Sequence, residues 1–228
     1  MISITRVATS ILCAVLFSSV GAAQELSRYR DFEFGMSIES VAKLAHTNAS
    51  GARTVHQRPE VIQTLDWDPQ GYLDNSPRAE SIRDIRFHFY NDELFKMVVV
   101  YDPNQTKGLT ANDLIEALSD LYGSAGKPET SLVVSGFLTY NDNEKVLARW
   151  ENAEYSFNLF RSRYGNSFGL VVFSKKLELL ASAASLEAVR LDELEAPARA
   201  GARQKKYEED EQALQEKARL INKPTFRP

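Results

Sequence analysis

Nine residues, from Asp66 to Asp74, have the side-chain spacing of a calcium-binding loop. Counted from Asp66, oxygen-bearing side chains occupy positions 1, 3, 5 and 9, and a glycine occupies position 6. Calcium takes oxygen ligands, and in such loops a glutamate at position 12 completes the coordination shell. Position 12 here is Pro77, so the expected site is weak. Its predicted ligands are Asp66, Asp68, Gln70 and Asp74.

The pattern G-x-S-x-G, typical of a hydrolase nucleophile, occurs at Gly165–Gly169. Such a serine needs a strand before it and a helix after it, so that its hydroxyl is lifted above the sheet edge. Here a strand-like run, Leu170–Phe173, follows the motif, and all three histidines precede it. We therefore interpret the motif as a glycine-rich turn.

The histidines and carboxylates have no recognisable catalytic or metal-binding spacing. His56 and Glu60 are four residues apart, but Pro59 disfavours the helix that would align them. His88 alternates away from the apolar face of its strand and is expected to face solvent. General acid–base catalysis needs a carboxyl group in a desolvated cleft, which no spacing here indicates. We expect no cofactor and no enzymatic activity.

Aromatic residues are the remaining candidates for binding a partner. Trp67, Tyr72 and Tyr90 are expected on loops or on the outer sheet face, where aromatic side chains favour contacts with protein or glycan. The others lie at strand spacing and are predicted to pack in the core: Phe87, Phe89, Phe95, Trp150, Tyr155, Phe157 and Phe168.

Two capped helices, each followed by short strands, should position these side chains. Ser37 and Thr110 are predicted helix N-caps, and Asp113 completes a capping box with Thr110. The tight connections between strands favour antiparallel meanders over parallel crossovers. The predicted fold is α+β, with two helix-plus-meander units and helices on one face of an antiparallel sheet. Strands are expected at 61–67, 82–90, 94–101, 132–140, 146–150, 155–160 and 168–173, and the units at about 29–102 and 108–174.

The C-terminal part of the chain changes character. Apolar residues from Leu177 to Leu194 recur at helical spacing, and Pro197 is expected to end that helix. The predicted domain therefore covers 24–196, with a helix at 175–196, and a charged tail covers 197–228. Such charge density is typical of a solvated helix or a mobile tail. The alternative is a docking helix that contacts a partner through Tyr207, Leu214, Ala218 and Ile221.

Residues 1–23 have the layout of a secretory signal peptide. Arg6 precedes an apolar run that closes on small residues and is too short to span a bilayer. We expect cleavage after Ala23 and a periplasmic or secreted chain without a transmembrane segment. Cleavage also removes Cys13, the sole cysteine, so no disulfide is expected. The net charge of −4 and the lack of a basic stripe argue against nucleic acid and anionic membranes as partners.

The stretch Phe34-Gly35-Met36-Ser37, with Val41 four residues on, resembles the opening of the outer-membrane-assembly lipoprotein family. The repeated helix-plus-meander layout is also similar to the β-lactamase-inhibitor-protein fold, and the chain resembles a member of an exported bacterial family. The resemblance implies an architecture over residues 29–174 and a tendency to bind protein. A lipidation cysteine and the inhibitor's paired cysteines are both missing, so neither anchoring nor inhibition is implied.

The leading functional expectation is an exported, non-enzymatic binding or envelope-associated protein. Its partner is expected to be a protein or an envelope component, with Trp67, Tyr72, Tyr90, Tyr207 and Leu214 as contact residues. Two alternatives stay open: a secreted hydrolase that uses carboxylates, and a weak calcium-stabilised module.

Overall fold

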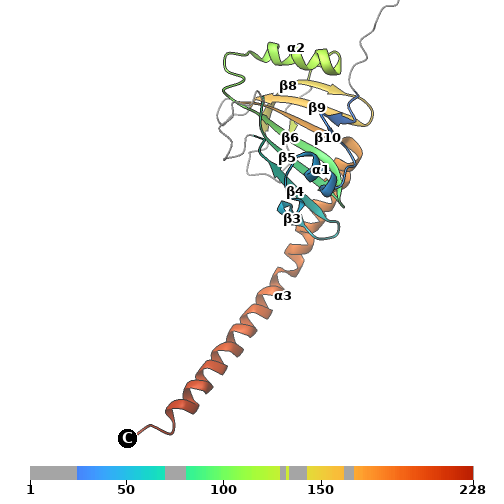
Figure 1. Ribbon diagram of the computed structural model, residues 1–228. Helices are drawn as coiled ribbons and strands as arrows, with labels where there is room; N and C mark the ends of the chain where they lie inside the picture. The colour runs from blue at the N-terminus through green and yellow to red at the C-terminus, as the bar shows by residue number, and fades with distance from the viewer. Residues whose placement is uncertain (1–24, 70–80, 129–131, 134–142, 162–166, 228) are drawn as a thin grey trace, which may run out of the picture.

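A large antiparallel sheet, with a two-stranded hairpin beside it, organises the chain (Figure 1). The computed structural model describes residues 25–69, 81–128, 132–133, 143–161 and 167–227. Within these residues the helices are α1 (Ile38–Leu44), the short 3₁₀ helix η1 (Ala49–Gly51), α2 (Ala111–Tyr122) and α3 (Lys175–Asn222). The strands are β1 (Arg28–Tyr29), β2 (Phe32–Glu33), β3 (Arg53–His56), β4 (Ile62–Trp67), β5 (Ile82–Tyr90), β6 (Glu93–Tyr101), β7 (Leu132–Val133), β8 (Asn143–Glu151), β9 (Tyr155–Arg161) and β10 (Phe168–Ser174).

Two meanders meet at the centre of the large sheet. Its strand order is β3-β4-β5-β6-β10-β9-β8-β7, and neighbouring strands are antiparallel. The strands β3 to β6 follow α1, the strands β7 to β10 follow α2, and the last strand of each series pairs with the other. The predicted α+β fold with two helix-plus-meander units is therefore confirmed.

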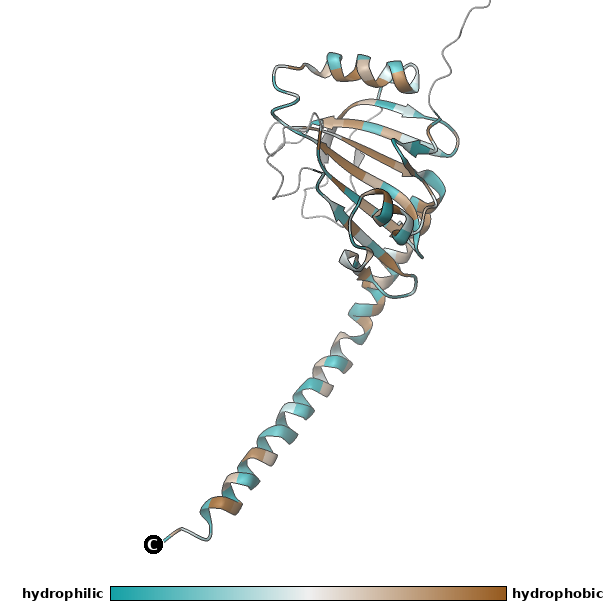
Figure 2. Cartoon of the chain, in the orientation of Figure 1, coloured by the Kyte–Doolittle hydropathy of each residue, from teal (hydrophilic) through white to brown (hydrophobic). Residues whose placement is uncertain are grey.

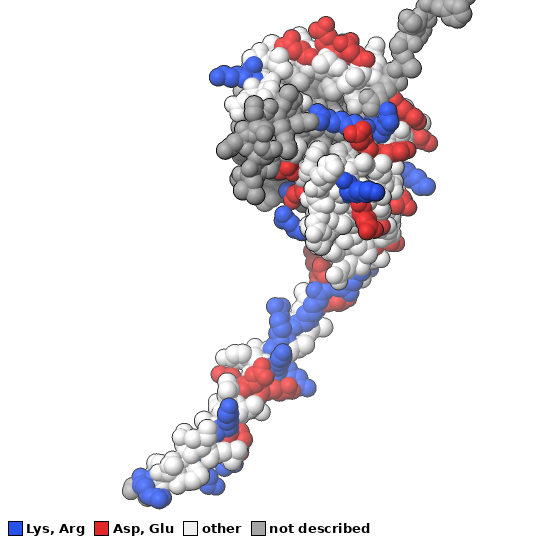
Figure 3. Space-filling model, in the orientation of Figure 1, with Lys and Arg blue, Asp and Glu red and all other residues white. Residues whose placement is uncertain are grey.

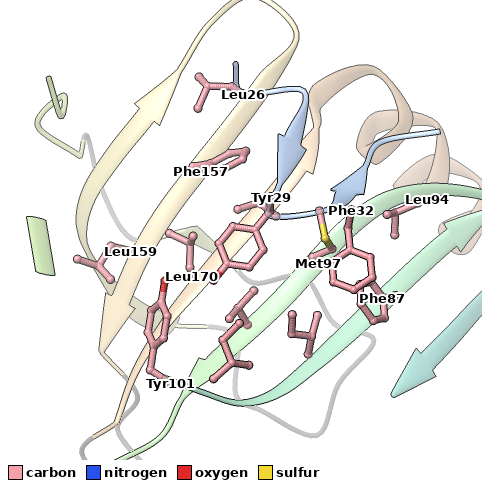
Figure 4. Packing of buried hydrophobic residues seen from close by; sticks show 14 of the residues in the cluster. Leu26, Tyr29, Phe32, Phe87, Leu94, Met97, Tyr101, Phe157, Leu159 and Leu170 are labelled. Atoms are coloured by element: carbon pink, nitrogen blue, oxygen red, sulfur yellow. The ribbon is translucent and has the colours of Figure 1, made fainter. Parts of the chain in front are cut away.

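One face of the sheet carries the main hydrophobic core (Figure 4). Phe87 on β5 and Met97 on β6 are register partners and fully buried. The β1–β2 hairpin lies over them, with the Phe32 ring centroid 4.7 Å from that of Phe87. Removing this apolar surface from water is the dominant favourable term in folding. The aromatic residues predicted for the core are buried, except that Tyr155 is half-buried and stacks on Phe34.

Polar side chains start α1 and α2 where the sequence predicts, because they satisfy free backbone N–H groups of the first turn. Ser37 caps α1, and the Asp92 carboxylate accepts a hydrogen bond from the Ile38 N–H at 2.9 Å, which ties α1 to the β5–β6 turn. Thr110 and Asp113 form the predicted capping box of α2. Both helices pack into the same core cluster, so they lie on one face of the sheet.

The third helix, α3, runs unbroken from Lys175 to Asn222, and the prediction that Pro197 ends it is wrong. Proline removes one backbone N–H donor and crowds the preceding turn. The Arg199 guanidinium bridges that turn, since it binds Asp192 at 2.7 Å and Glu195 at 3.1 Å. The 48-residue helix is about 70 Å long and projects from the sheet as a largely hydrophilic rod (Figures 1 and 2).

Two sequence predictions fall partly or wholly outside the described residues. Of the strand expected at 132–140 only Leu132 and Val133 are described, and the expected signal peptide is not described. Among the residues that the structure describes, no helix combines the length and the apolar character that a bilayer crossing needs.

Gly169, in the central pair of strands, has no room for a side chain. A Cβ built there would lie 2.3 Å from Cζ of Phe160 and 2.8 Å from the Val99 carbonyl oxygen. Since backbone and a packed ring cannot both move aside, we expect Gly169→Ala to lower the free energy of unfolding by about 2–3 kcal/mol. Urea denaturation monitored by circular dichroism measures this loss.

The matched control is Gly201→Ala on α3, where nothing outside the helix's own backbone lies within 4 Å of a new Cβ. This change should leave the free energy of unfolding unchanged or raise it by up to about 1 kcal/mol, because alanine favours the helix over glycine. Equal effects of the two substitutions would contradict the close approach of β10 to β6.

Candidate functional site

The sheet face opposite the main core carries the first turns of α3, residues 175–188, which we call the base of α3. Side chains on its first turns pack against β4, β5 and β6. The Ser185 hydroxyl, also buried there, donates to the Ala181 carbonyl at 2.7 Å, so its burial leaves no unsatisfied group. The buried members of this cluster are Ile62, Phe95, Ala181 and Ala184, bordered by Val55, Tyr90 and Leu177.

Two ion pairs fix the base of α3 on the sheet. Lys96 on β6 donates to Glu178 on α3 at 3.0 Å, and the Lys96 side chain is only 8% exposed. Lys175, the first residue of α3, lies 2.7 Å from Glu151 on β8 and lowers the pKa of that carboxyl. The buried Lys96 ammonium is largely removed from water, so loss of its ion pair with Glu178 would be strongly destabilising. The pair therefore holds α3 in its position on the sheet.

His88 lies beside this ion pair and is buried, so the prediction that it faces solvent is wrong. It is 4% exposed because the outer face of β5 and β6 is itself packed at the base of α3. Its Nε2 has no hydrogen-bond partner among the described residues. Burial, with the nearby charges of Lys96 and Arg86, lowers the pKa of His88 to about 3. The imidazole is therefore uncharged at neutral pH.

Farther along α3, Arg58 joins the β3–β4 loop to the helix. Its guanidinium makes a bidentate contact with Glu195, at 2.5 and 2.7 Å, and reaches Asp192 at 3.3 Å. Hydrogen bonds from Arg58 and Arg199 lower the pKa of Glu195 to about 2. The residues Arg58, Asp192, Glu195 and Arg199 form a charge clamp that holds the turn containing Pro197.

After Glu195 of the charge clamp α3 continues as an arm, defined as residues 196–222. Every residue from Ala196 to Arg227 is exposed. Tyr207, Leu214 and Ile221 are 60%, 67% and 62% exposed, and their spacing of seven residues places them along one side of the helix. A row of large side chains without contact to its own domain is the strongest candidate for a binding surface in the described part of the chain.

The structure places the predicted contact residues in different environments. Trp67 belongs to the side of the main core, with its ring centroid 5.6 Å from that of Phe32. Tyr90 is on the outer sheet face as expected, but it packs beside the base of α3. Tyr207 and Leu214 are exposed on the arm. Of the predicted contact residues that the structure describes, the arm therefore brings together the two whose side chains are exposed, Tyr207 and Leu214.

The first predicted calcium ligand, Asp66, is already engaged. Its carboxylate accepts hydrogen bonds from Arg86 and, at 3.1 Å, from Arg53. Asp68 is exposed just after β4. Among the described residues, no three His, Cys, Asp or Glu side chains gather as a metal-binding group. The calcium site stays a prediction, because two of its four predicted ligands, Gln70 and Asp74, lie outside the described ranges; the predicted contact residue Tyr72 lies outside them as well.

The described part of the G-x-S-x-G motif leads into a strand. Ser167 is buried directly before β10, and Gly169 lies within β10. The helix that a nucleophile elbow needs after its serine is therefore absent at this point of the described chain.

Sequence reasoning missed the charge clamp. Arg199 is four residues from Glu195, a helical spacing that signals pairing only if the helix is assumed to pass Pro197. Arg58 and Glu195 are 137 residues apart, and nothing local in the sequence links them.

The chain matches no protein-family model, no curated protein sequence and no solved structure. The resemblance drawn from its N-terminal motif therefore stays a prediction.

The buried His88 makes stability depend on pH. The unfolded chain binds a proton at this histidine near pH 6.5, whereas the folded chain does so only near pH 3. Stability is therefore complete above pH 6.5 and falls as the pH drops below it, by about 1.4 kcal/mol per pH unit. Between pH 6.5 and 5, we expect wild type to lose about 2 kcal/mol more than His88→Phe in urea denaturation.

His46→Asn is the control for this measurement, because His46 is exposed and asparagine tolerates its positive φ of 51°. Its pH dependence should match that of the wild type. A His88→Phe variant with the same acid sensitivity as wild type would show that His88 is not the buried neutral group described above.

Proposed function

We propose that this chain is an exported, non-enzymatic binding protein in which the α+β domain holds a long helical arm for contact with a protein or an envelope component. The observation that carries the proposal is the continuation of α3 for 27 exposed residues after Glu195 of the charge clamp. A helix of this length in solvent gains no stability from its own domain, although packing is what stabilises most helices.

The side chains on the arm support a binding role. Tyr207, Leu214 and Ile221 remain in water in the isolated chain, and a partner that covered them would recover their hydrophobic free energy. Figure 2 shows apolar residues reappearing near the far end of the arm, after a hydrophilic stretch. Tyrosine in particular contributes large, rigid contact area at protein interfaces.

The fixed base of α3 also supports a binding role for the arm. The Lys96–Glu178 pair and the charge clamp fix the direction in which the arm leaves the domain. Because the arm starts from a fixed base, less orientational freedom is lost when it meets a partner. Export is the second half of the proposal and rests on the signal-peptide layout of residues 1–23.

Photo-cross-linking in the native organism tests this function. We expect a benzoylphenylalanine residue in place of Leu214 to cross-link a protein in the envelope or secreted fraction. The same residue in place of Glu216, on the opposite side of the helix by its spacing, should cross-link much less. Gel shift and mass spectrometry measure both products.

The same fractions supply the control for export, since the recovered chain should begin at Gln24. No cross-link from either position, or an uncleaved chain found only in the cytoplasm, would contradict the proposed function. Equal cross-linking from both positions would contradict a binding surface confined to one side of the arm.

A further inference from the structure

On any α-helix the residues four, seven and eleven positions before and after a given residue lie on its side, and around Tyr207 the arm exposes all of these positions. At about 100° per residue, these positions fall within a band roughly 80° wide. We call Tyr207 and these six flanking positions the symmetric stripe.

The chemistry of the symmetric stripe is complementary about its centre. Arg203 lies four residues before Tyr207 and Glu211 four residues after it, so the two positions carry opposite charges. Ala200 lies seven residues before and Leu214 seven residues after, so a small side chain mirrors a large one. An antiparallel helix of the same sequence would place Arg203 against Glu211 and Leu214 against Ala200, and at the ends of the stripe it would place Ala196 against Ala218.

Charges beside the stripe follow the same rule. Lys205 and Lys206 precede Tyr207, whereas Glu208 and Glu209 follow it, and positive and negative side chains gather in turn along the arm (Figure 3). Antiparallel pairing brings the positively charged stretch of one copy to the same height along the axis as the negatively charged stretch of the other, with Lys205 and Glu209 on the side that faces away from the partner. Parallel pairing would set residues of like charge side by side, and their repulsion disfavours that arrangement.

The contacts within the arm leave the stripe available. Tyr207 donates its hydroxyl proton to Glu211 at 3.2 Å, and both side chains are exposed. Arg203 is exposed and makes no ion pair within the described ranges, in contrast to Arg199 and Arg219. A carboxylate from a second chain would give Arg203 the partner that its own helix does not supply.

The length of the arm fits the same arrangement. Asp192 of the charge clamp lies fifteen residues before Tyr207, and Asn222, the last residue of α3, lies fifteen residues after it. Two α3 helices centred on Tyr207 therefore overlap over residues 192–222, with the tip of each arm at the charge clamp of the other. The buried residues Ala181, Ala184 and Ala188 lie roughly 100° around the helix from the stripe, so the partner helix passes beside the domain.

We propose that the arm binds a second copy of this chain, antiparallel and centred on Tyr207. The proposal rests on the proposed function in taking the arm as a binding surface, and it names the partner. The interface is isologous, so each contact between Arg203 and Glu211 forms twice. The product is a pair of α+β domains at opposite ends of a two-helix rod.

A charge-swap series measured by sedimentation velocity tests this pairing on the full chain. At about 10–100 µM the wild type should sediment as a dimer. Arg203→Glu alone sets glutamate against Glu211 twice, and Glu211→Arg alone sets arginine against Arg203 twice, so each should weaken the dimer by about tenfold or more. The double variant restores unlike pairs and should restore the dimer.

Arg227→Glu makes the same charge change outside the stripe and should leave the dimer intact. Circular dichroism must show equal helix content in all variants, so that loss of the dimer is not caused by loss of the helix.

A monomeric wild type, or a double variant whose dimer is no tighter than that of the single variants, would overturn the proposal. A monomer that still cross-links a different protein through Leu214 overturns only this pairing; a monomer without cross-links overturns the proposed function as well.

Discussion

The antiparallel pairing of β6 with β10 is the constraint on which the other elements depend. It joins the last strands of two helix-plus-meander units, so that α1 and α2 come to the same face of one continuous sheet. The pairing is close enough at Gly169 that the Phe160 ring and the Val99 carbonyl take the place of a side chain. Without it each meander would expose an edge strand and half of the shared core.

The same pairing determines where α3 begins. β10 ends at Ser174 in the middle of the sheet, and α3 starts at the next residue on the outer face. The helix must therefore cross that face. The buried polar groups there, His88 and the Lys96–Glu178 pair, lie where the helix packs on the sheet. The charge clamp then carries the helix past Pro197, and from that point the arm makes no contact with its domain within the described residues.

Local signals in the sequence were sufficient for the elements whose causes are local. Thr110 and Asp113 start α2 through side chains three residues apart, and the alternation of Ile85, Phe87 and Phe89 places them in the core. The alternating pattern of β5 predicts one covered sheet face and places His88 and Tyr90 on the other face, which is covered only through the tertiary position of α3. The prediction that α3 ends at Pro197 likewise leaves out the contact between Glu195 and Arg58, because Arg58 is far away in the sequence.

The candidate site was predicted in part. Tyr207 and Leu214 stood out as apolar residues in a charged segment, and they are exposed on the arm. Their relation to Arg203, Glu211 and Ala200 becomes visible only when the segment is one straight helix, because a break at Pro197 would remove the common axis. The symmetry of the stripe is thus a property of the sequence that needs the structure to be recognised.

The central claim, two arms paired antiparallel about Tyr207, is tested most directly by a distance between two copies. A spin label on Asn222→Cys, in a chain whose only other cysteine is replaced by Cys13→Ser, reports that distance by pulsed electron paramagnetic resonance. Antiparallel pairing predicts about 45 Å between the two labelled backbone positions, from fifteen residues on each side of the centre. A separation near the roughly 10 Å between paired helix axes, which a parallel pair gives, or no dipolar coupling at all, would contradict the account.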